Sequence, residues 1–298
     1  MRFACARERY APRLWQDRAG FFDLKTFRLL PVAPEARGVL MGLDAATDFD
    51  SYAVLPRDRR LLQRFVEEGY ARICDEHAPL SPFQRPRSTG TPYLRELHWA
   101  VTGRCNLSCR HCFMCSPQGK YGQTERADML RVLSMLEDAN VACVSLTGGE
   151  PLLYPHLREL IARLSEKGIA VNEIVTNGVL LSEGLLRFLQ DHGQKPMFQI
   201  SLDGVGEHDR MRGAEGAEQG ALRAIERSVH HGFFTAVTSV FSRENLHTLG
   251  ACYEQMKRLR VSAWLIGRAQ TTGLWKGGPM ALGTAELGQA LLRLQRRW

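Results

Sequence analysis

The sequence predicts an α/β protein, a partial (β/α)6 barrel preceded by a small α+β winged-helix-like module. Two observations predict this fold class. From residue 93 onward, six apolar runs of strand length alternate with stretches of helical periodicity. Before residue 80 the alternation is shorter and less regular, and a proline-rich segment separates the two regions. We therefore expect domains at 1–79 and 93–298, joined by a linker at 80–92.

The first region is expected to place strands beside short helices. Its elements are expected as strands at Arg2–Cys5 and Phe21–Leu30, helices at Ala33–Leu43 and Pro56–Glu68, and a helix stop with a further strand in Glu68–Cys74. The linker contains Pro82, Pro86 and Pro92, which lack a backbone donor and resist regular structure.

The second region is expected to fold as six β–α units in series. Strands are expected at Leu97–Val101, Val141–Leu146, Ala170–Thr176, Pro196–Leu202, Phe234–Phe241 and Val261–Ile266, and helices at Thr124–Asp138, Leu157–Lys167, Ser182–Asp191, Gly220–His231, Asn245–Arg260 and Thr284–Trp298. Nearly continuous apolar strands suit a parallel sheet that is buried on both faces. Six units are fewer than the eight of a closed barrel, so we expect an open sheet with its chemistry at the carboxyl ends of the strands.

The composition favours a globular, cytoplasmic protein. Hydrophobic residues are 44% and charged residues 24% of the chain, and no run is long and apolar enough to span a membrane. The first thirty residues contain no apolar run typical of a secretory signal, so the eight cysteines are better interpreted as partly metal ligands than as disulfides. The net charge of +7 is spread along the chain, and we expect neither a nucleic-acid nor a membrane partner.

Three thiols follow the first strand of the second region within eight residues. Cys105, Cys109 and Cys112 are dense enough to converge on one metal centre of the iron–sulfur or zinc type. Three protein ligands leave one position open for a substrate or cofactor. The alternative is a closed zinc site that uses Cys115 as the fourth ligand.

The next strands also end in residues suited to ligand binding. The second strand ends in Gly148-Gly149-Glu150-Pro151, where paired glycines allow close backbone approach and a carboxylate suits an ammonium group. The third strand ends in Thr176-Asn177-Gly178. Ser201 and Asp203 are two residues apart at the end of the fourth strand, so they face the same side and are suited to a ribose or an ammonium. The alternative is that these are ordinary turn and helix-entry residues.

Taken in order, these four motifs resemble the radical S-adenosylmethionine (SAM) superfamily. The resemblance extends from about Tyr93 to the end of the chain and includes the spacing C-x3-C-x2-C. It implies a 4Fe–4S cluster ligated by Cys105, Cys109 and Cys112, whose open iron binds SAM. It also implies reductive cleavage of SAM to a 5′-deoxyadenosyl radical that abstracts hydrogen, with an electron donor such as a flavodoxin or ferredoxin.

The resemblance further implies roles for individual residues around SAM. Gly148, Gly149 and Glu150 would hold the methionine ammonium, and Ser201 and Asp203 would line the ribose side.

Two further residues are assigned by the same resemblance. His111 occupies the position before the third cysteine, near adenine. Arg212, in the run His208–Gly213, would meet the SAM carboxylate.

The first region resembles the PqqD-like recognition element of ribosomal-peptide maturases, in which a leader peptide adds a strand to a sheet edge. The alternative is an extension that binds nothing. Together, the two resemblances imply an enzyme that modifies a peptide or protein side chain. A small-metabolite substrate, or a truncated and non-catalytic iron–sulfur protein, is the alternative.

Maturases of this kind commonly continue into a SPASM or twitch extension that holds auxiliary clusters. Cys252 is the only cysteine after Cys143, so we expect that extension to be absent here. The protein is then expected either to work with a single cluster or to be a piece of a longer chain.

Overall fold

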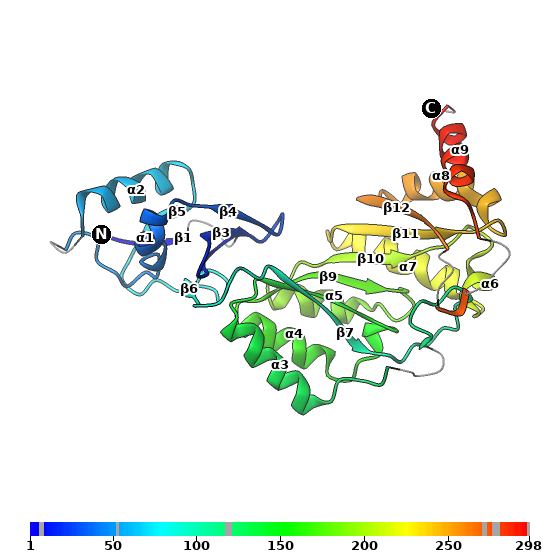
Figure 1. The fold of residues 1–298 in the computed structure, drawn as a ribbon, viewed down its shortest axis with the longest axis horizontal. Helices are drawn as coiled ribbons and strands as arrows, with labels where there is room; N and C mark the ends of the chain where they lie inside the picture. Colours follow the sequence, from blue (N-terminus) through cyan, green and yellow to red (C-terminus); the bar gives the residue numbers. More distant parts are fainter. Residues whose placement is uncertain (6–8, 52–53, 117–120, 270–272, 276–280, 297–298) are drawn as a thin grey trace. The chain divides into compact units, whose positions relative to one another are not determined.

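The computed structural model describes residues 1–5, 9–51, 54–116, 121–269, 273–275 and 281–296 (Figure 1). The chain divides into two compact units. The first comprises Met1–Leu97, Arg126–Val144 and Glu159–Asn172, and the second comprises His98–Glu125, Ser145–Arg158 and Glu173–Trp298. The first compact unit thus extends beyond the amino-terminal region, and the domain boundaries at 79 and 93 stay a prediction.

The amino-terminal region is a β-rich α+β module. In one sheet β1 (Arg2–Cys5) pairs antiparallel with β5 (Ala71–Cys74). The other sheet has the order β4-β3-β2-β6, formed by Arg28–Pro31, Ala19–Asp23, Tyr10–Leu14 and Arg87–Ser88. Two helices accompany the sheets, α1 (Arg37–Met41) and α2 (Pro56–Glu67).

The expectation of one strand over Phe21–Leu30 was wrong. The segment forms the antiparallel pair β3 and β4, with a turn between them. Asp23 stabilises this turn because its carboxylate accepts hydrogen bonds from the Lys25 backbone N–H (2.9 Å) and the Thr26 hydroxyl (2.9 Å). An apolar run therefore concealed a turn that a side chain supports.

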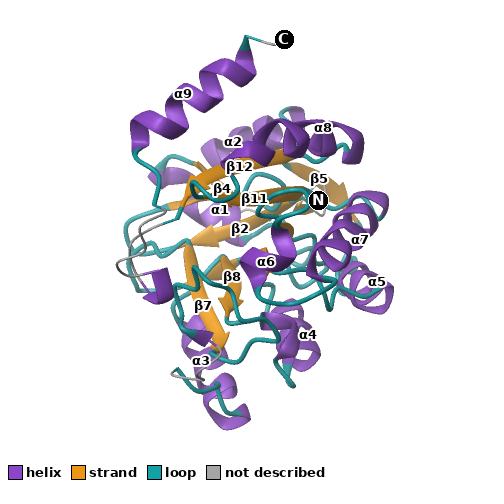
Figure 2. Cartoon of the chain, turned by 90° about the vertical axis from the view of Figure 1, so that its right-hand side faces the viewer, coloured by secondary structure: helices purple, strands orange, loops and turns teal. Residues whose placement is uncertain are grey.

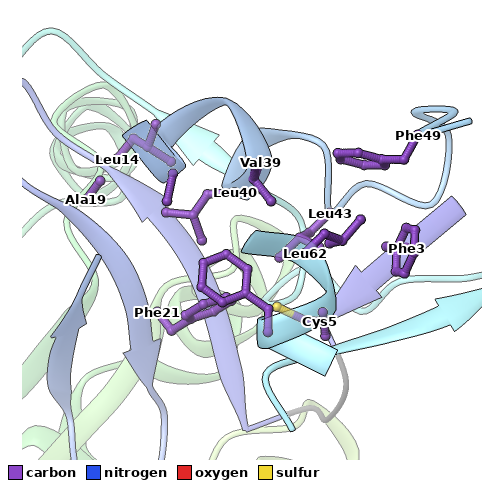
Figure 3. Close-up of a cluster of buried hydrophobic side chains, with 13 residues drawn as sticks. Phe3, Cys5, Leu14, Ala19, Phe21, Val39, Leu40, Leu43, Phe49 and Leu62 are labelled. Atoms are coloured by element: carbon purple, nitrogen blue, oxygen red, sulfur yellow. The ribbon is translucent and has the colours of Figure 1, made fainter. Parts of the chain in front are cut away.

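Aromatic and aliphatic side chains from both sheets and both helices form the core of this module. Phe21 is 1% exposed and lies edge-on to Phe65, with ring centroids 5.1 Å apart. Figure 3 shows Cys5, Leu40 and Leu62, from β1, α1 and α2, around the same interior. A helix as short as α1 is not stable in isolation, so its stability here comes from this packing.

The proline-rich segment 80–92 differs from a free linker. Its residues Arg87–Ser88 form β6, in parallel with β2, and Phe83 is buried. The buried guanidinium of Arg13 donates hydrogen bonds to the carbonyl oxygens of Phe83 (3.3 Å), Arg85 (2.9 Å) and Gly168 (2.9 Å). Burial lowers the pKa of Arg13 to about 9. Arg13 and the pairing of β6 with β2 therefore help to hold the segment in place.

The region from residue 93 onward confirms the predicted fold class. Its six strands lie in sequential order and form a parallel, open sheet, as expected for a partial barrel (Figure 1). They are β7 (Glu96–Thr102), β8 (Cys143–Gly148), β9 (Ala170–Thr176), β10 (Met197–Ser201), β11 (Thr235–Phe241) and β12 (Ala263–Arg268). The carboxyl ends of these strands lie at one edge, where the motifs of the sequence are placed.

Helices connect these strands. They are α3 (Arg126–Asp138), α4 (Leu157–Glu166), α5 (Glu183–Asp191), α6 (His208–Arg212), α7 (Ala217–His230), α8 (Leu249–Leu259) and α9 (Thr284–Gln295). α5 illustrates why these segments are helical. Ser182 caps its first turn by accepting a hydrogen bond from the Leu185 N–H (3.2 Å), and Leu186 and Leu189 are fully buried on its inner face. Side chains of α9 pack in one hydrophobic cluster with residues of α8 and β12, and Figure 2 shows α9 as the last helix before the carboxyl end of the chain. No helix in the described ranges has the length and apolar character needed to cross a bilayer.

Candidate metal centre and cofactor site

The three predicted cysteine ligands lie together in the loop after β7. Cys105, Cys109 and Cys112 are free thiols, of which Cys109 is buried and the other two are half-buried. All three pack in one cluster with Leu107 and Ala217. The loop therefore brings three sulfur donors into one shielded place, as their spacing predicts.

Each of these sulfurs faces a nitrogen donor of the chain. The backbone N–H of Leu107 donates to Cys105 Sγ (3.4 Å), and that of Ser116 donates to Cys112 Sγ (3.4 Å). Burial raises the pKa of the Cys105 thiol to about 11. Metal binding requires deprotonated thiols, and N–H donors to sulfur favour that form.

The donor set fits an iron–sulfur cluster. Thiolates are the ligands that such clusters use, and three of them leave one iron open. Cys115, which the zinc alternative needs, is not among the side chains of the cluster that holds the other three. Within the described part of the chain, no three His, Cys, Asp or Glu side chains are arranged around a single metal ion. A 4Fe–4S cluster does not need ligands that converge on a single ion, because each cysteine binds a separate iron.

The paired glycines at the end of β8 are required by the chain's own backbone. Gly148 has a φ of +140°, and a Cβ there would lie 2.2 Å from the carbonyl oxygen of Thr102. A Cβ on Gly149 would lie 2.3 Å from the carbonyl oxygen of Arg104, and the Gly149 N–H donates to Thr102 O (2.7 Å). The glycines thus bring the end of β8 against the start of the cysteine loop, a reason that the sequence analysis missed.

Glu150 ties the ends of β8 and β9 together. Its carboxylate is fully buried and accepts hydrogen bonds from the Thr176 hydroxyl (2.7 Å), the Leu152 N–H (3.0 Å) and the Asn177 N–H (2.8 Å). The Asn177 side chain in turn donates to Asn106 Oδ1 in the cysteine loop (2.9 Å). Burial raises the pKa of Glu150. A carboxylate has about four acceptor positions, and these bonds take up three of them.

His111, Asp203 and Arg212 meet in a buried group. Asp203 Oδ2 lies 2.8 Å from Arg212 Nη2 and 3.3 Å from His111 Nε2, and Asp203 is fully buried. Burial alone would raise the pKa of Asp203, but the charges of Arg212 and His111 bring it below its usual value. The structure thus joins three residues that the sequence analysis assigned to separate parts of SAM. Ser201 remains at the end of β10, in register with Thr238.

His208 also contacts Asp203. Its Nδ1 accepts a hydrogen bond from the Asp203 backbone N–H (2.8 Å). Burial lowers the pKa of His208 to about 4, so the imidazole is neutral near pH 7.

The short helix α6, which the sequence analysis did not predict, lies against the cysteine loop. The N–H of Ser108 donates to the carbonyl oxygen of Arg212 (3.1 Å), and that of Arg110 donates to that of Met211 (3.0 Å). Gly213 has a φ of +66°, and a Cβ there would lie 2.6 Å from Ser108 O. The run His208–Gly213 was the sequence signal that could have predicted this contact, because its glycine stands where the two backbones approach closely.

Comparison with known proteins adds a family to this geometry. A family model described as "Radical SAM superfamily" matches residues 99–256. The matched range includes the cysteine loop, Glu150, Asp203 and Arg212.

Two curated relatives resemble the chain over part of their length. The AdoMet-dependent heme synthase of Nitratidesulfovibrio vulgaris is 26% identical over 217 residues, which are 72% of this chain and 59% of that protein. The antilisterial bacteriocin subtilosin biosynthesis protein AlbA of Bacillus subtilis is 29% identical over 166 residues, which are 55% of this chain and 37% of that protein. The chain thus spans less than two thirds of either relative.

One solved structure resembles the whole chain. SuiB of Streptococcus suis, bound to the precursor peptide SuiA, matches with a TM-score of 0.67 at 14% sequence identity. The match covers 100% of this chain and 70% of that one. At this identity the likeness shows a shared fold.

Proposed function

This chain belongs to the radical SAM superfamily, and on that premise we propose that it binds a 4Fe–4S cluster and SAM and modifies a peptide or protein side chain. The observation that carries the proposal is the loop with Cys105, Cys109 and Cys112, three free thiols packed in one cluster. The bound cofactors supply a 5′-deoxyadenosyl radical by reductive cleavage of SAM, for which a flavodoxin or ferredoxin provides the electron.

The residues of the chain position these cofactors and keep water away from them. Glu150 fixes the β8 end and offers its remaining acceptor position, with the backbone of Gly148 and Gly149, to the methionine ammonium. Ser201 would contact the ribose. Asp203 would act indirectly, because its carboxylate pairs with Nε2 of His111, the residue that would lie near the adenine. Burial of this group suits a reaction whose radical must be shielded from solvent.

Release of 5′-deoxyadenosine tests the activity. After anaerobic reconstitution with iron and sulfide, dithionite and SAM are expected to yield 5′-deoxyadenosine, detected by mass spectrometry. A protein that holds about four irons per chain but yields none would support the non-catalytic alternative and contradict the proposal.

The peptide substrate is supported by the relative named for bacteriocin biosynthesis and by a groove in the amino-terminal module. The groove has a volume of about 200 Å³ and lies between the edge strand β4 and α2. Its lining is mostly apolar and comprises Phe21, Leu30, Pro31, Val32, Ala33, Ala36, Leu61, Arg64, Phe65, Glu68 and Tyr70. An edge strand beside an apolar groove suits an extended peptide that adds a strand, so we propose that this module is a PqqD-like element that binds a leader peptide.

Replacement of Leu30 with arginine tests this groove. The variant is expected to weaken binding of a fluorescent leader peptide, encoded beside the gene, at least tenfold in anisotropy titrations, because it places a charge in the apolar lining. Ile73→Arg is the matched control, since Ile73 is exposed on β5, at the edge of the other sheet. Equal affinity of the Leu30→Arg variant and the wild type, or absence of binding by the wild type, would contradict the leader proposal.

A small-metabolite substrate is the second candidate, and the relative named as a heme synthase favours it. Deuterium transfer distinguishes the two candidates. A deuterated precursor peptide is expected to label the 5′-deoxyadenosine that the enzyme releases, whereas a metabolite enzyme would leave it unlabelled. We further propose that the protein acts in the cytoplasm, where its cysteines stay reduced.

A further inference from the structure

The three cysteine sulfurs differ in the kind of donor that each one receives. Cys105 and Cys112 receive neutral donors, namely backbone N–H groups and, for Cys105, also the side-chain amide of Asn177 at 3.9 Å. Cys109 Sγ lies 3.5 Å from Nη1 of the charged Arg212. A backbone donor survives any substitution except proline. The donor to Cys109 is a charged side chain, and a substitution removes it.

Arg212 is fixed in a position from which it donates a hydrogen bond to Cys109 Sγ. The side chain is 10% exposed, and its Nη2 pairs with the fully buried carboxylate of Asp203 at 2.8 Å. One terminal nitrogen of the guanidinium, Nη2, thus binds Asp203, and the other, Nη1, reaches the sulfur of Cys109. A planar group with several donors permits this arrangement. The backbone bonds of α6 to the cysteine loop fix the helix that carries this side chain.

These contacts differ from the role that the sequence analysis gave to Arg212. That role was to meet the SAM carboxylate, for which the guanidinium would have to offer free donors toward a ligand. Nη2 is instead engaged by Asp203 and Nη1 by Cys109, and Nε, which is buried and has no hydrogen-bond partner among the described residues, is the nitrogen left for a ligand.

We infer that Arg212 is a positioning residue that raises the reduction potential of the cluster through its hydrogen bond and charge at Cys109. The inference rests on the proposed function. A cluster gains negative charge on reduction, so a nearby cation and an N–H donor to a ligand sulfur stabilise the reduced form. Asp203 keeps the guanidinium in place, because a buried charge requires a partner.

The variant Arg212→Gln tests the inference by EPR-monitored redox titration of the reconstituted protein. We expect its iron content and its affinity for SAM to stay within twofold of wild type, while the midpoint potential becomes more negative. Arg210→Gln is the matched control. Arg210 lies on the same short helix, but its partners are Glu207 and Glu244, and its potential is expected to equal that of the wild type.

Arg212→Lys keeps the inference testable if Arg212→Gln fails to hold a cluster. A lysine keeps the charge opposite Asp203, but one ammonium lacks the fork that reaches both Asp203 and Cys109. Its potential is therefore also expected below wild type. A wild-type potential in the variant that retains the cluster would overturn the inference, as would a tenfold loss of SAM affinity at unchanged potential, which would assign Arg212 to SAM. A wild-type protein that holds no cluster would instead refute the proposed function itself.

Discussion

Replacement of Cys109 with alanine is expected to abolish cluster binding. Cys109 is the most buried of the three thiols and the one in contact with Arg212, so the variant loses a ligand at the shielded side of the site. The site has three protein ligands for four irons, and the two thiolates that remain are too few to hold the cluster. After anaerobic reconstitution we expect a colourless protein, with iron reduced from about four atoms per chain to a background level.

The matched control is Cys115→Ala, in the same loop. Cys115 is half-buried and lies outside the cluster of side chains around the other three cysteines. The control variant is expected to keep its colour and its iron. A chromophore that survives in Cys109→Ala, or that disappears equally in Cys115→Ala, would contradict the assignment of ligands.

Replacement of Gly148 with alanine is expected to destabilise the protein and to impair SAM binding. The φ of +140° is one that a side chain rarely adopts, and the new Cβ would lie 2.2 Å from Thr102 O. Backbone strain alone costs on the order of 1–3 kcal/mol, and the clash adds to it. A loss of about 3 kcal/mol corresponds to a fall in Tm of about 6–12 °C for a domain of this size, measured by calorimetry.

Gly250→Ala is the control for that substitution. Gly250 lies in α8, its φ is not positive, and a Cβ there has no atom within 4 Å. Because alanine is the better helix former, by about 1 kcal/mol, this variant is expected to keep or slightly raise Tm. A Tm of Gly148→Ala equal to that of Gly250→Ala would show that the close approach of β8 to Thr102 is not required.

Sequence periodicity was enough to predict the six-stranded region. Its strands are buried between helices, so apolar runs and helical spacing directly reflect the environment of each element. The β9 bounds agree at both ends with the expected Ala170–Thr176. The cysteine loop was predictable for a related reason, since its three ligands are close in sequence and need no knowledge of distant contacts.

Contacts between distant residues were not predictable from pattern. The pairing of Cys109 with Arg212 joins residues 103 positions apart, and nothing local to Arg212 distinguishes it from an exposed arginine. β2 and β6 were not predicted: β6 has two residues, and it pairs with β2 more than 70 positions away in the sequence. The glycines after β8 were correctly singled out, but their neighbour, Thr102 on another strand, is visible only in the structure.

The central claim is that three thiolates hold a four-iron cube with one iron left open for SAM. Mössbauer spectroscopy of protein reconstituted with ⁵⁷Fe, recorded before and after SAM addition, tests it most directly. The account predicts that about one quarter of the iron signal shifts when SAM is added, since one iron of four lacks a protein ligand. Zinc in place of iron, or an iron spectrum that SAM leaves unchanged, would contradict it.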